Sequence, residues 1–411
     1  MGLAELGRPV AAAFPWADAF LTVGVTGTNG KTSTSHFIAA IYAAAGTKVV
    51  CQSTLGYSVD GQELAIERSE RGFVQAMQRA SEQGVRHAVV EVTSKALSQG
   101  YARKWRFDHG VFTNLTRDHV AEHGSWEHYL ASKAQLFVHL GPGRTAVFNA
   151  HDEAALLLDR IVPSDVHRVW YGAPSRGPEL HTPDLAARTV TPSRHGTTLE
   201  LAPSPLGERL GANVEVGLIG EVYGENALAA AAFALSQGID AVAVRAGLAS
   251  VRHLPGRFDV VSEDPLVVLD FAHTPDALAR VCDTARRLAG GHRVLVVFGA
   301  AGGYDGPKRE PMGEAVGARA DVAFVTNENP RQEDPLAIIE AVATGCRRAG
   351  RATTRVIADR RDAIRAALGE AKAGDVVLVT GRGREEGLIE GSVVTAYSDV
   401  TAVREALGRG G

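Results

Sequence analysis

The sequence predicts an α/β protein in which a doubly wound, phosphate-loop-type sheet domain is followed by a second, Rossmann-like α/β domain. Short β-branched apolar runs alternate with longer Ala-rich stretches from Leu21 onward, and this alternation is typical of parallel strands covered by helices. The same rhythm starts again near Arg257, and a chain of 411 residues is too long for one hydrophobic core. We therefore predict a central domain over residues 1–252 and a C-terminal domain over residues 253–411.

The central domain begins with a short segment, residues 1–20, before its first strand. Its clearest predicted strands are 21–26 (LTVGVT), 47–52 (TKVVCQ) and 87–92 (HAVVEV). A helix is expected over about 31–45. Between about 165 and 216, Pro, Gly, Ser and Thr become frequent and runs such as TTLELA alternate, which predicts a small antiparallel β insertion.

The C-terminal domain shows four apolar runs separated by segments long enough for helices. The predicted strands are 267–272 (VVLDFA), 293–299 (RVLVVFG), 322–327 (VAFVTN) and 376–381 (VVLVTG). In open parallel sheets ligands bind at the carboxyl ends of the strands. We therefore expect the functional residues at those ends in both domains.

Charge and cysteine usage exclude several classes of partner. The formal net charge of −4 gives no electrostatic basis for binding nucleic acid or an anionic membrane. Three scattered cysteines fit a reducing compartment and exclude a cysteine zinc ribbon. No basic start with a long apolar run marks the first residues. We expect a cytoplasmic protein acting on small molecules.

The stretch 24–34 (GVTGTNGKTST) lies between the first predicted strand and the first predicted helix, as a phosphate-binding loop does. The general phosphate-loop pattern has glycine where this chain has Val25. The alternative to a phosphate-binding loop is therefore a tight turn with a solvated lysine. Glycine lets backbone amides approach an anion, and a helix N-terminus favours negative charge. Lys31 is placed to reach the β- and γ-phosphates of ATP, and Thr32 to offer a hydroxyl to Mg²⁺.

Glu91 ends a predicted buried strand in the run EVTSKALSQG. A buried carboxylate is costly unless a cation or a hydrogen-bond donor accompanies it. A Mg²⁺ ligand is the functional interpretation. A glutamate that reaches solvent at the strand end is the alternative.

Further motifs follow in order along the chain. They are TNLTRDH with a following HG, SKAQLF, LPGRFDVV, DFAHTPDAL, GGYDGPKR, NENPRQEDP and GRGREEG. Together with TGTNGKT and EVTS, this order resembles the Mur ligases, and within them the UDP-N-acetylmuramoyl-tripeptide synthetases, which add the third amino acid. The resemblance covers nearly the whole chain from about residue 20.

The resemblance implies that ATP phosphorylates a substrate carboxylate and that an amine then displaces phosphate from the acyl phosphate. It implies phosphate contacts from Thr28, Asn29, Gly30, Lys31, Thr32 and Ser33. Thr32 and Glu91 would bind one Mg²⁺, and Glu91 and His119 a second. Lys133 matches a lysine that the family carbamylates to support the second metal, the alternative being a helical lysine on a solvated face.

The resemblance also implies nucleotide contacts in the rest of the chain. Asn226 matches the second of two nucleotide-contacting asparagines, while Tyr223 stands in the place of the first. Arg257 matches an arginine near the phosphates, and Asp270 a carboxylate that meets the ribose. Lys308 and the following Arg309 come after a strand end and would reach phosphate or the tetrahedral species. We assign catalytic roles to Lys31, His119, Lys133 and Lys308.

The amino-acid site implied by the resemblance departs from the branch's usual motifs. Its D-N-P-R motif becomes Glu328, Asn329, Pro330 and Arg331, its GKGHE motif becomes GRGRE with Arg384 and Glu385, and Tyr304 replaces an arginine. That replacement removes a bidentate carboxylate clamp. Arg331 would bind the α-carboxylate of the amino acid and Glu385 its amine, and meso-diaminopimelate is not expected.

The acceptor site departs as well. The family's S-S-H becomes Thr93, Ser94 and Lys95, and an expected arginine aligns with Tyr101, with Arg103 close by. Only about 20 residues precede the phosphate loop, where the family carries a UDP-binding domain. We therefore expect a carboxylate substrate that is not UDP-linked.

Three functions remain open from the sequence. The leading hypothesis is an ATP- and Mg²⁺-dependent ligase that joins an amine to a small, non-UDP-linked carboxylate, as in specialised metabolism. The first alternative is a peptidoglycan tripeptide synthetase whose UDP-binding part is supplied elsewhere. The second is a non-catalytic ATP-binding regulatory protein, which the combination of Lys31, Glu91, His119 and Lys133 argues against.

Overall fold

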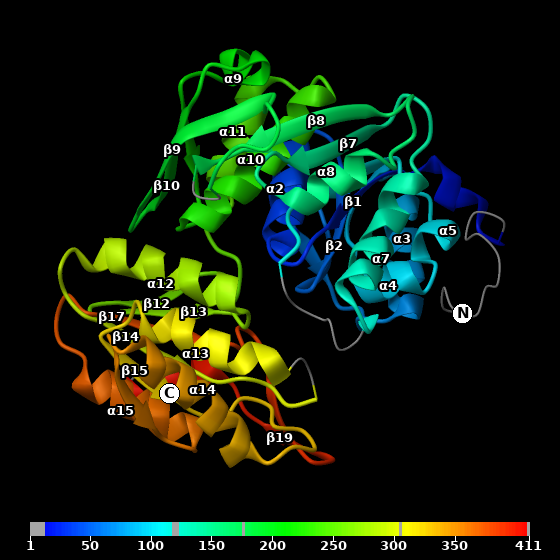
Figure 1. Ribbon diagram of the computed structural model, residues 1–411. Coiled ribbons are helices and arrows are strands. Elements are labelled where there is room, and N and C mark those ends of the chain that lie inside the picture. The colour runs from blue at the N-terminus through cyan, green and yellow to red at the C-terminus, as the bar shows by residue number, and fades with distance from the viewer. Residues whose placement is uncertain (1–12, 117–122, 175–176, 304–305, 409–411) are drawn as a thin grey trace. The chain divides into compact units, whose positions relative to one another are not determined.

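The computed structural model confirms the predicted fold class: it contains two α/β units, each built on a largely parallel sheet. It describes residues 13–116, 123–174, 177–303 and 306–408. The first unit comprises residues 1–116 and 125–252, and the second residues 117–124 and 253–411. Each unit is described by itself (Figure 1).

Within the described residues, one sheet of eleven strands organises the first unit, in the order β11-β10-β9-β8-β7-β6-β1-β5-β2-β3-β4. Its strands are β1 (Leu21–Thr26), β2 (Val49–Ser53), β3 (Gly56–Val59), β4 (Gln62–Leu64), β5 (His87–Glu91), β6 (His109–Phe112), β7 (Thr145–Asn149), β8 (His167–Gly172), β9 (Leu185–Ser193), β10 (Gly196–Leu201) and β11 (Asn213–Val216). The six neighbouring strands β8, β7, β6, β1, β5 and β2 are parallel to one another. The predicted strands at 21–26, 47–52 and 87–92 correspond to β1, β2 and β5.

The segment predicted as a β insertion extends this sheet. β8 pairs in parallel with β7, and β9 continues in parallel beside β8 before turning into the antiparallel strands β10 and β11. The alternating pattern identified the antiparallel part, but the pairing of β8 and β9 depends on contacts distant in sequence. Strands β8 to β11 therefore extend the sheet at one edge.

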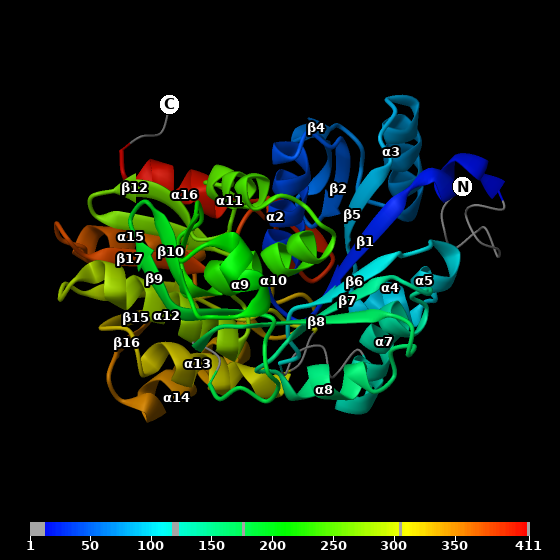
Figure 2. The same ribbon diagram turned by 90° about the horizontal axis from the view of Figure 1, so that it is seen from above.

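Helices cover both faces of the first sheet (Figure 2). They are η1 (Pro15–Ala19), α2 (Lys31–Ala44), α3 (Glu70–Glu82), α4 (Ser94–Ser98), α5 (Tyr101–Lys104), α7 (Trp126–Val138), α8 (Glu153–Asp159), α9 (Pro205–Leu210), α10 (Glu221–Ser236) and α11 (Ala241–Ser250). Helices α2, α10 and α11 pack together on one face. On the other, Phe73 and Met77 of α3 join Leu136 and Phe137 of α7 in a continuous core, so the loops at the strand ends follow well-packed layers.

The second unit has a six-stranded sheet in the order β12-β13-β17-β14-β15-β16 within its described residues. All its pairs are parallel except that of β12 with β13. Its elements are β12 (Asp259–Glu263), β13 (Leu266–Asp270), α12 (Pro275–Ala289), β14 (Val294–Phe298), η3 (Gly306–Lys308), α13 (Arg309–Gly317), β15 (Val322–Val325), α14 (Pro335–Ala349), β16 (Thr353–Val356), α15 (Arg360–Glu370), β17 (Val376–Thr380), the hairpin β18 (Gly387–Glu390) and β19 (Val393–Ala396), and α16 (Asp399–Ala406). The four predicted strands are β13, β14, β15 and β17.

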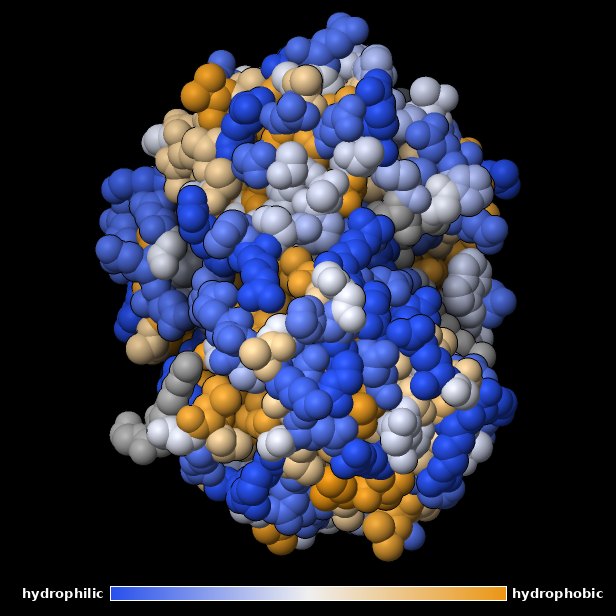
Figure 3. Space-filling view, turned by 90° about the vertical axis from the view of Figure 1, so that its left-hand side faces the viewer, coloured by the Kyte–Doolittle hydropathy of each residue, from blue (hydrophilic) through white to orange (hydrophobic). Residues whose placement is uncertain are grey.

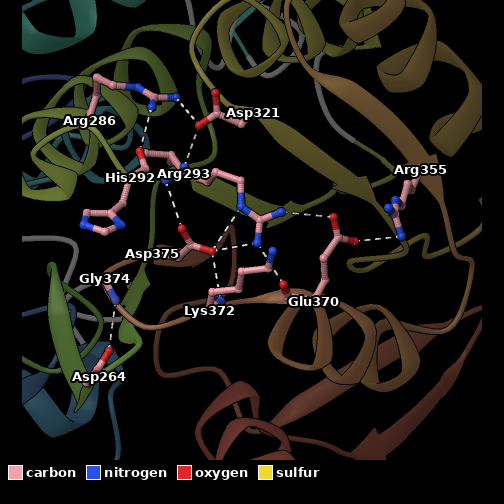
Figure 4. A network of polar contacts seen from close by, with 11 residues as sticks. Asp264, Arg286, His292, Arg293, Asp321, Arg355, Glu370, Lys372, Gly374 and Asp375 are labelled. Atoms are coloured by element: carbon pink, nitrogen blue, oxygen red, sulfur yellow. Dashed lines mark hydrogen bonds and ion pairs between the residues drawn. The ribbon is translucent and has the colours of Figure 1, made fainter.

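A polar network fastens the amino ends of the strands of this second sheet, opposite the edge where ligands are expected (Figure 4). Asp375, directly before β17, accepts hydrogen bonds from the backbone of Arg293 and Lys372 and from the guanidinium of Arg293, whose Nη2 lies 2.7 Å away. Glu370 joins Arg293 to Arg355. Burial alone would raise the pKa of Asp375, but these hydrogen bonds outweigh it and hold the pKa below its ordinary value of 3.8.

Substituting Asp375→Asn should lower the free energy of unfolding by about 2–4 kcal/mol, because it removes a buried carboxylate that accepts several hydrogen bonds and leaves Arg293 only the longer ion pair with Glu370, at 3.5 Å. The folded-state pKa lies below the ordinary value of 3.8. The contribution is therefore complete at neutral pH and is lost as the pH falls through the folded-state pKa. Denaturant titrations at pH 7 and below 4 measure both effects. Glu405→Gln, in an exposed ion pair with Arg361, is the control and should change stability by less than about 1 kcal/mol.

In the described part of the chain, no helix has both the length and the apolar character needed to cross a membrane. On the face shown in Figure 3, hydrophilic residues predominate and hydrophobic residues occur in separate small groups, as is ordinary for a folded protein surface.

Candidate active site

The phosphate-loop motif forms the turn between β1 and α2, and two of its glycines are required by the geometry. Gly30 has φ +87°, and a Cβ atom there would lie 2.3 Å from Oδ1 of Asn226. A Cβ atom on Gly27 would lie 1.9 Å from Oγ1 of Thr113. No side chain fits at either position without moving its neighbour, so this turn is more constrained than a general glycine-rich turn.

The segment that follows β6 makes hydrogen bonds to the loop. The backbone N–H of Asn29 donates to Oδ1 of Asn114 at 3.0 Å, and that of Thr28 donates to the carbonyl of Asn114 at 2.8 Å. Thr113 adds a hydroxyl bond of 2.6 Å to the carbonyl of Asn29. Two amides that the sequence assigned to phosphate therefore donate within the protein. The amides of the first turn of α2, residues 31–33, lie at a helix N-terminus, where the helix dipole favours an anion, and are the better candidates.

Two lysines converge on one carbonyl oxygen of this loop. Nζ of Lys31 donates to the carbonyl oxygens of Gly27 (3.1 Å) and Thr28 (2.7 Å). Nζ of Lys133 donates to the same oxygen of Gly27 at 2.7 Å and lies 4.4 Å from the centroid of the Tyr129 ring. Lys133 is only 1% exposed. It is therefore not the solvated helical lysine of the alternative interpretation.

A cluster of oxygen atoms lies beside the loop, at the carboxyl end of β5. Oε2 of Glu91 accepts the hydroxyl of Thr32 at 2.9 Å and both the backbone N–H and the hydroxyl of Thr54, at 2.9 and 2.8 Å. Glu91 is 8% exposed, so it does not simply end its strand in solvent. Carboxylate and hydroxyl oxygens are the ligands that Mg²⁺ prefers, and it needs only one or two carboxylates. Thr54 is a site residue that the sequence reasoning missed.

Asn226 lies across the loop, in the first turns of α10. Its Nδ2 is buried and has no hydrogen-bond partner among the described residues, while its Oδ1 faces Gly30. A buried donor without an acceptor is costly. An acceptor on a bound nucleotide would satisfy it, so the residues present fit ATP at this loop.

In the second unit, the residues assigned to the amino acid come together at the carboxyl ends of β15 and β17. Nδ2 of Asn329 donates to Glu385 at 2.8 Å, and Oδ1 of Asn329 accepts from the guanidinium of Arg382 at 2.8 Å. Arg382 is fully buried, and it was missed as a supporting residue. Burial, with Glu385 adding to it, raises the pKa of Glu328. Arg384 is exposed.

The other residues assigned to ATP in the second unit lie at the start of its sheet and after β14. Both carboxylate oxygens of Asp270 accept backbone N–H groups, those of Phe258 and Ala272, at 2.7 Å. The guanidinium of Arg257 stacks 4.9 Å from the Phe271 ring. Lys308 is buried at the end of η3. Asp270 thus shapes the loop that carries Arg257.

The residues assigned to the acceptor line a short helical stretch after β5. Thr93 caps α4 by accepting the N–H of Ala96, Ser94 is buried, and Lys95 and Arg103 are exposed. Tyr101 packs in an aromatic cluster, with ring centroids 5.5 Å from Phe73 and 6.1 Å from Phe107. Its uncharged ring supplies no cation at this position. His119 and Tyr304 lie outside the described residues.

Comparison with known proteins decides the family. The Mur ligase middle domain matches residues 25–234, and the Mur ligase glutamate ligase domain matches residues 256–383. A UDP-N-acetylmuramoyl-L-alanyl-D-glutamate–2,6-diaminopimelate ligase from Solibacter usitatus is 37% identical over 391 residues, which are 93% of this chain and 76% of the relative. The chain belongs to the Mur ligase family.

Solved structures agree with this assignment. A solved structure of a UDP-N-acetylmuramoyl-L-alanyl-D-glutamate–2,6-diaminopimelate ligase superposes with a TM-score of 0.63 at 31% identity. The match covers 95% of this chain and 78% of the other. A Mycobacterium tuberculosis folylpolyglutamate synthase, solved with ADP and AMPPCP, has a TM-score of 0.71 at 21% identity, over 99% and 96% of the two chains. The second comparison shows a shared fold alone.

Family membership confirms the enzyme class and the cofactors expected from the sequence. Mur ligases are ATP- and Mg²⁺-dependent ligases that form carbon–nitrogen bonds, and this chain is one of them. In this Mur ligase, the first-turn amides of α2, Lys31 and Asn226 would hold the nucleotide. Thr32 and Glu91 would hold a metal ion that neutralises charge on the phosphates.

Proposed function

We propose that this Mur ligase joins an amino acid to the free carboxylate of a UDP-linked muramoyl dipeptide. The observation that supports it is the similarity to relatives bearing that acceptor in their names: 37% identity to the Solibacter usitatus ligase and 35% to one from Aquifex aeolicus, over 93% and 95% of this chain. This similarity favours the peptidoglycan alternative over the leading hypothesis of a small, non-UDP-linked acid.

The proposed reaction has two steps. A carboxylate oxygen of the acceptor bonds to the γ-phosphorus of ATP while the bond from that phosphorus to the β–γ bridging oxygen breaks, and ADP leaves. The amine then attacks the acyl carbon, loses a proton and displaces inorganic phosphate. Charge on the transferring phosphoryl group needs cations around it, and Lys31 lies at the loop where that group would bind.

The amine is proposed to bind at the carboxyl edge of the second sheet. Arg331 would pair with its α-carboxylate and Glu385 would accept from its amine, while Asn329 and the buried Arg382 hold Glu385 in place. Which amino acid is used depends on groups further along its side chain, so a panel that includes diaminopimelate, lysine and ornithine is the appropriate test. We also propose that the reaction takes place in the cytoplasm, where ATP is supplied.

A second candidate acceptor follows from Tyr101, which lies in an aromatic cluster where an acceptor-binding arginine was expected. A small free acid would not need that arginine. Phosphate release should be measured with UDP-muramoyl dipeptide or with a panel of free acids and short peptides, each with the amino-acid panel, and the product identified by mass spectrometry. Our proposal predicts an amide of the UDP-linked acceptor. Turnover with free acids alone would contradict it and favour the second candidate.

A further inference from the structure

Arg331 has an unusual backbone that the β18–β19 hairpin holds in place. Its φ angle is +55°, in the left-handed region that costs a non-glycine residue free energy. Its N–H donates to the carbonyl of Ile389 at 3.1 Å, and its carbonyl accepts the N–H of Gly391 at 2.6 Å. The hairpin thereby fixes the direction in which the Arg331 side chain leaves the backbone.

The glycine-rich loop after β14 packs directly against the same segment. The N–H of Gly302 donates to the carbonyl of Asn329 at 2.8 Å. A Cβ atom on Gly302 would lie 1.9 Å from the carbonyl oxygen of Pro330, and one on Gly303 would lie 3.1 Å from Cδ of Arg331. Gly303 therefore provides the surface beside the aliphatic part of Arg331.

Glu333 ties that loop down. Its Oε1 accepts the N–H of Gly303 at 2.6 Å, and its two carboxylate oxygens lie 2.9 and 2.8 Å from Nη2 of Arg309. The hydrogen bond from Gly303, with Arg309 adding to it, lowers the pKa of Glu333. Arg309 is 13% exposed and Glu333 41% exposed. We call Gly303, Arg309 and Glu333 the clasp.

We infer that Arg309 and Glu333 are positioning residues for the amino-acid site: the clasp holds Gly303 against Arg331 and so sets the guanidinium for the incoming carboxylate. The inference rests on the proposed function, which places that carboxylate on Arg331. It also revises the expectation that Arg309 reaches phosphate, because Nη2 of Arg309 is engaged by Glu333. A positioned guanidinium loses less freedom on binding than a mobile one.

The test compares Glu333→Ala with Glu333→Gln in steady-state kinetics, varying the amino acid at saturating ATP and then ATP at a saturating amino acid. Glu333→Ala removes both bonds of the clasp and should raise KM for the amino acid on the order of tenfold, with kcat and KM for ATP changed less than about twofold. Glu333→Gln keeps an acceptor for Gly303 and should recover part of the loss. Glu340→Ala, in an exposed ion pair with Arg347, is the matched control.

Turnover of the unaltered protein with the UDP-linked acceptor tests the proposed function, and Arg331→Ala tests whether Arg331 binds the amino acid. A large rise in KM for the amino acid in Arg331→Ala, with none in Glu333→Ala, would overturn the clasp alone. No change in Arg331→Ala would remove Arg331 from the site and overturn the inference, while continued turnover with the UDP-linked acceptor would leave the proposed reaction standing. A parallel loss of kcat and of ATP binding in Glu333→Ala would show a general structural role and would also contradict the inference.

Discussion

The Lys133→Ala variant should lose turnover while retaining most of its affinity for ATP. Nζ of Lys133 is buried beneath the phosphate loop and donates to the carbonyl of Gly27, which Nζ of Lys31 also contacts. The two nitrogens lie within about 6 Å of each other, where like charges disfavour each other. A lysine carrying an anionic group would relieve that repulsion and support a cation. Removing it should therefore lower kcat by roughly a thousandfold.

Single-turnover phosphate release and equilibrium ATP binding together measure this prediction. Lys48→Ala is the control, because Lys48 is an exposed lysine of the same unit whose side chain makes one long hydrogen bond, to the carbonyl of Gln83. A kcat near that of the unaltered protein would exclude Lys133 from the mechanism. Loss of ATP binding together with kcat would instead make Lys133 a support of the loop.

The strands that the sequence predicted are those whose residues form a local apolar run. β1, β5, β14 and β17 are short β-branched runs that are buried on both faces, and such runs are typical of parallel sheets. β16 (Thr353–Val356) was not predicted, because it is short, polar and largely exposed at the sheet edge. Edge strands bury little, so their sequences carry little of the apolar signal.

The candidate site was predictable only where a motif carries its own geometry. Gly30 and Lys31 are consecutive residues of one loop, so the sequence alone places them at the same site. Thr54 reaches Glu91 because β2 and β5 are neighbours in the sheet, and nothing near Thr54 in the sequence indicates that pairing. The sequence showed Asn114 only as part of the TNLTRDH motif and gave it no role. Its hydrogen bond to the phosphate loop depends on β6 lying beside β1.

The same distinction applies in the second unit. The resemblance of the motifs placed Asn329, Arg331 and Glu385 in one site. It did not show which residues hold them in position. Arg382 was seen only as a changed residue within a motif and was given no role. In the structure it is buried and hydrogen-bonded to Asn329. Supporting residues of this kind are found from contacts between segments far apart in the chain, which a single sequence does not contain.

Gly30→Ala should largely abolish ATP binding by altering the phosphate loop itself. The residue has φ +87°, and an added Cβ atom would lie 2.3 Å from Oδ1 and 3.0 Å from Cγ of Asn226. Asn226 is buried and packed in α10, so the loop, rather than the helix, must move. That shift would displace the first-turn amides of α2 together with Lys31, and we expect ATP affinity to fall roughly a hundredfold.

Gly46→Ala is the matched control, because it separates backbone strain from the clash. Gly46 also has a positive φ angle, +73°, but a Cβ atom there would meet nothing within 4 Å. It should lose about 1 kcal/mol of folding stability and bind ATP normally. Isothermal titration with ATP and thermal unfolding of both variants distinguish the two effects. Normal ATP binding by Gly30→Ala would mean that the Asn226 side chain moves aside at little cost. Asn226 would then not be a fixed wall of the nucleotide site.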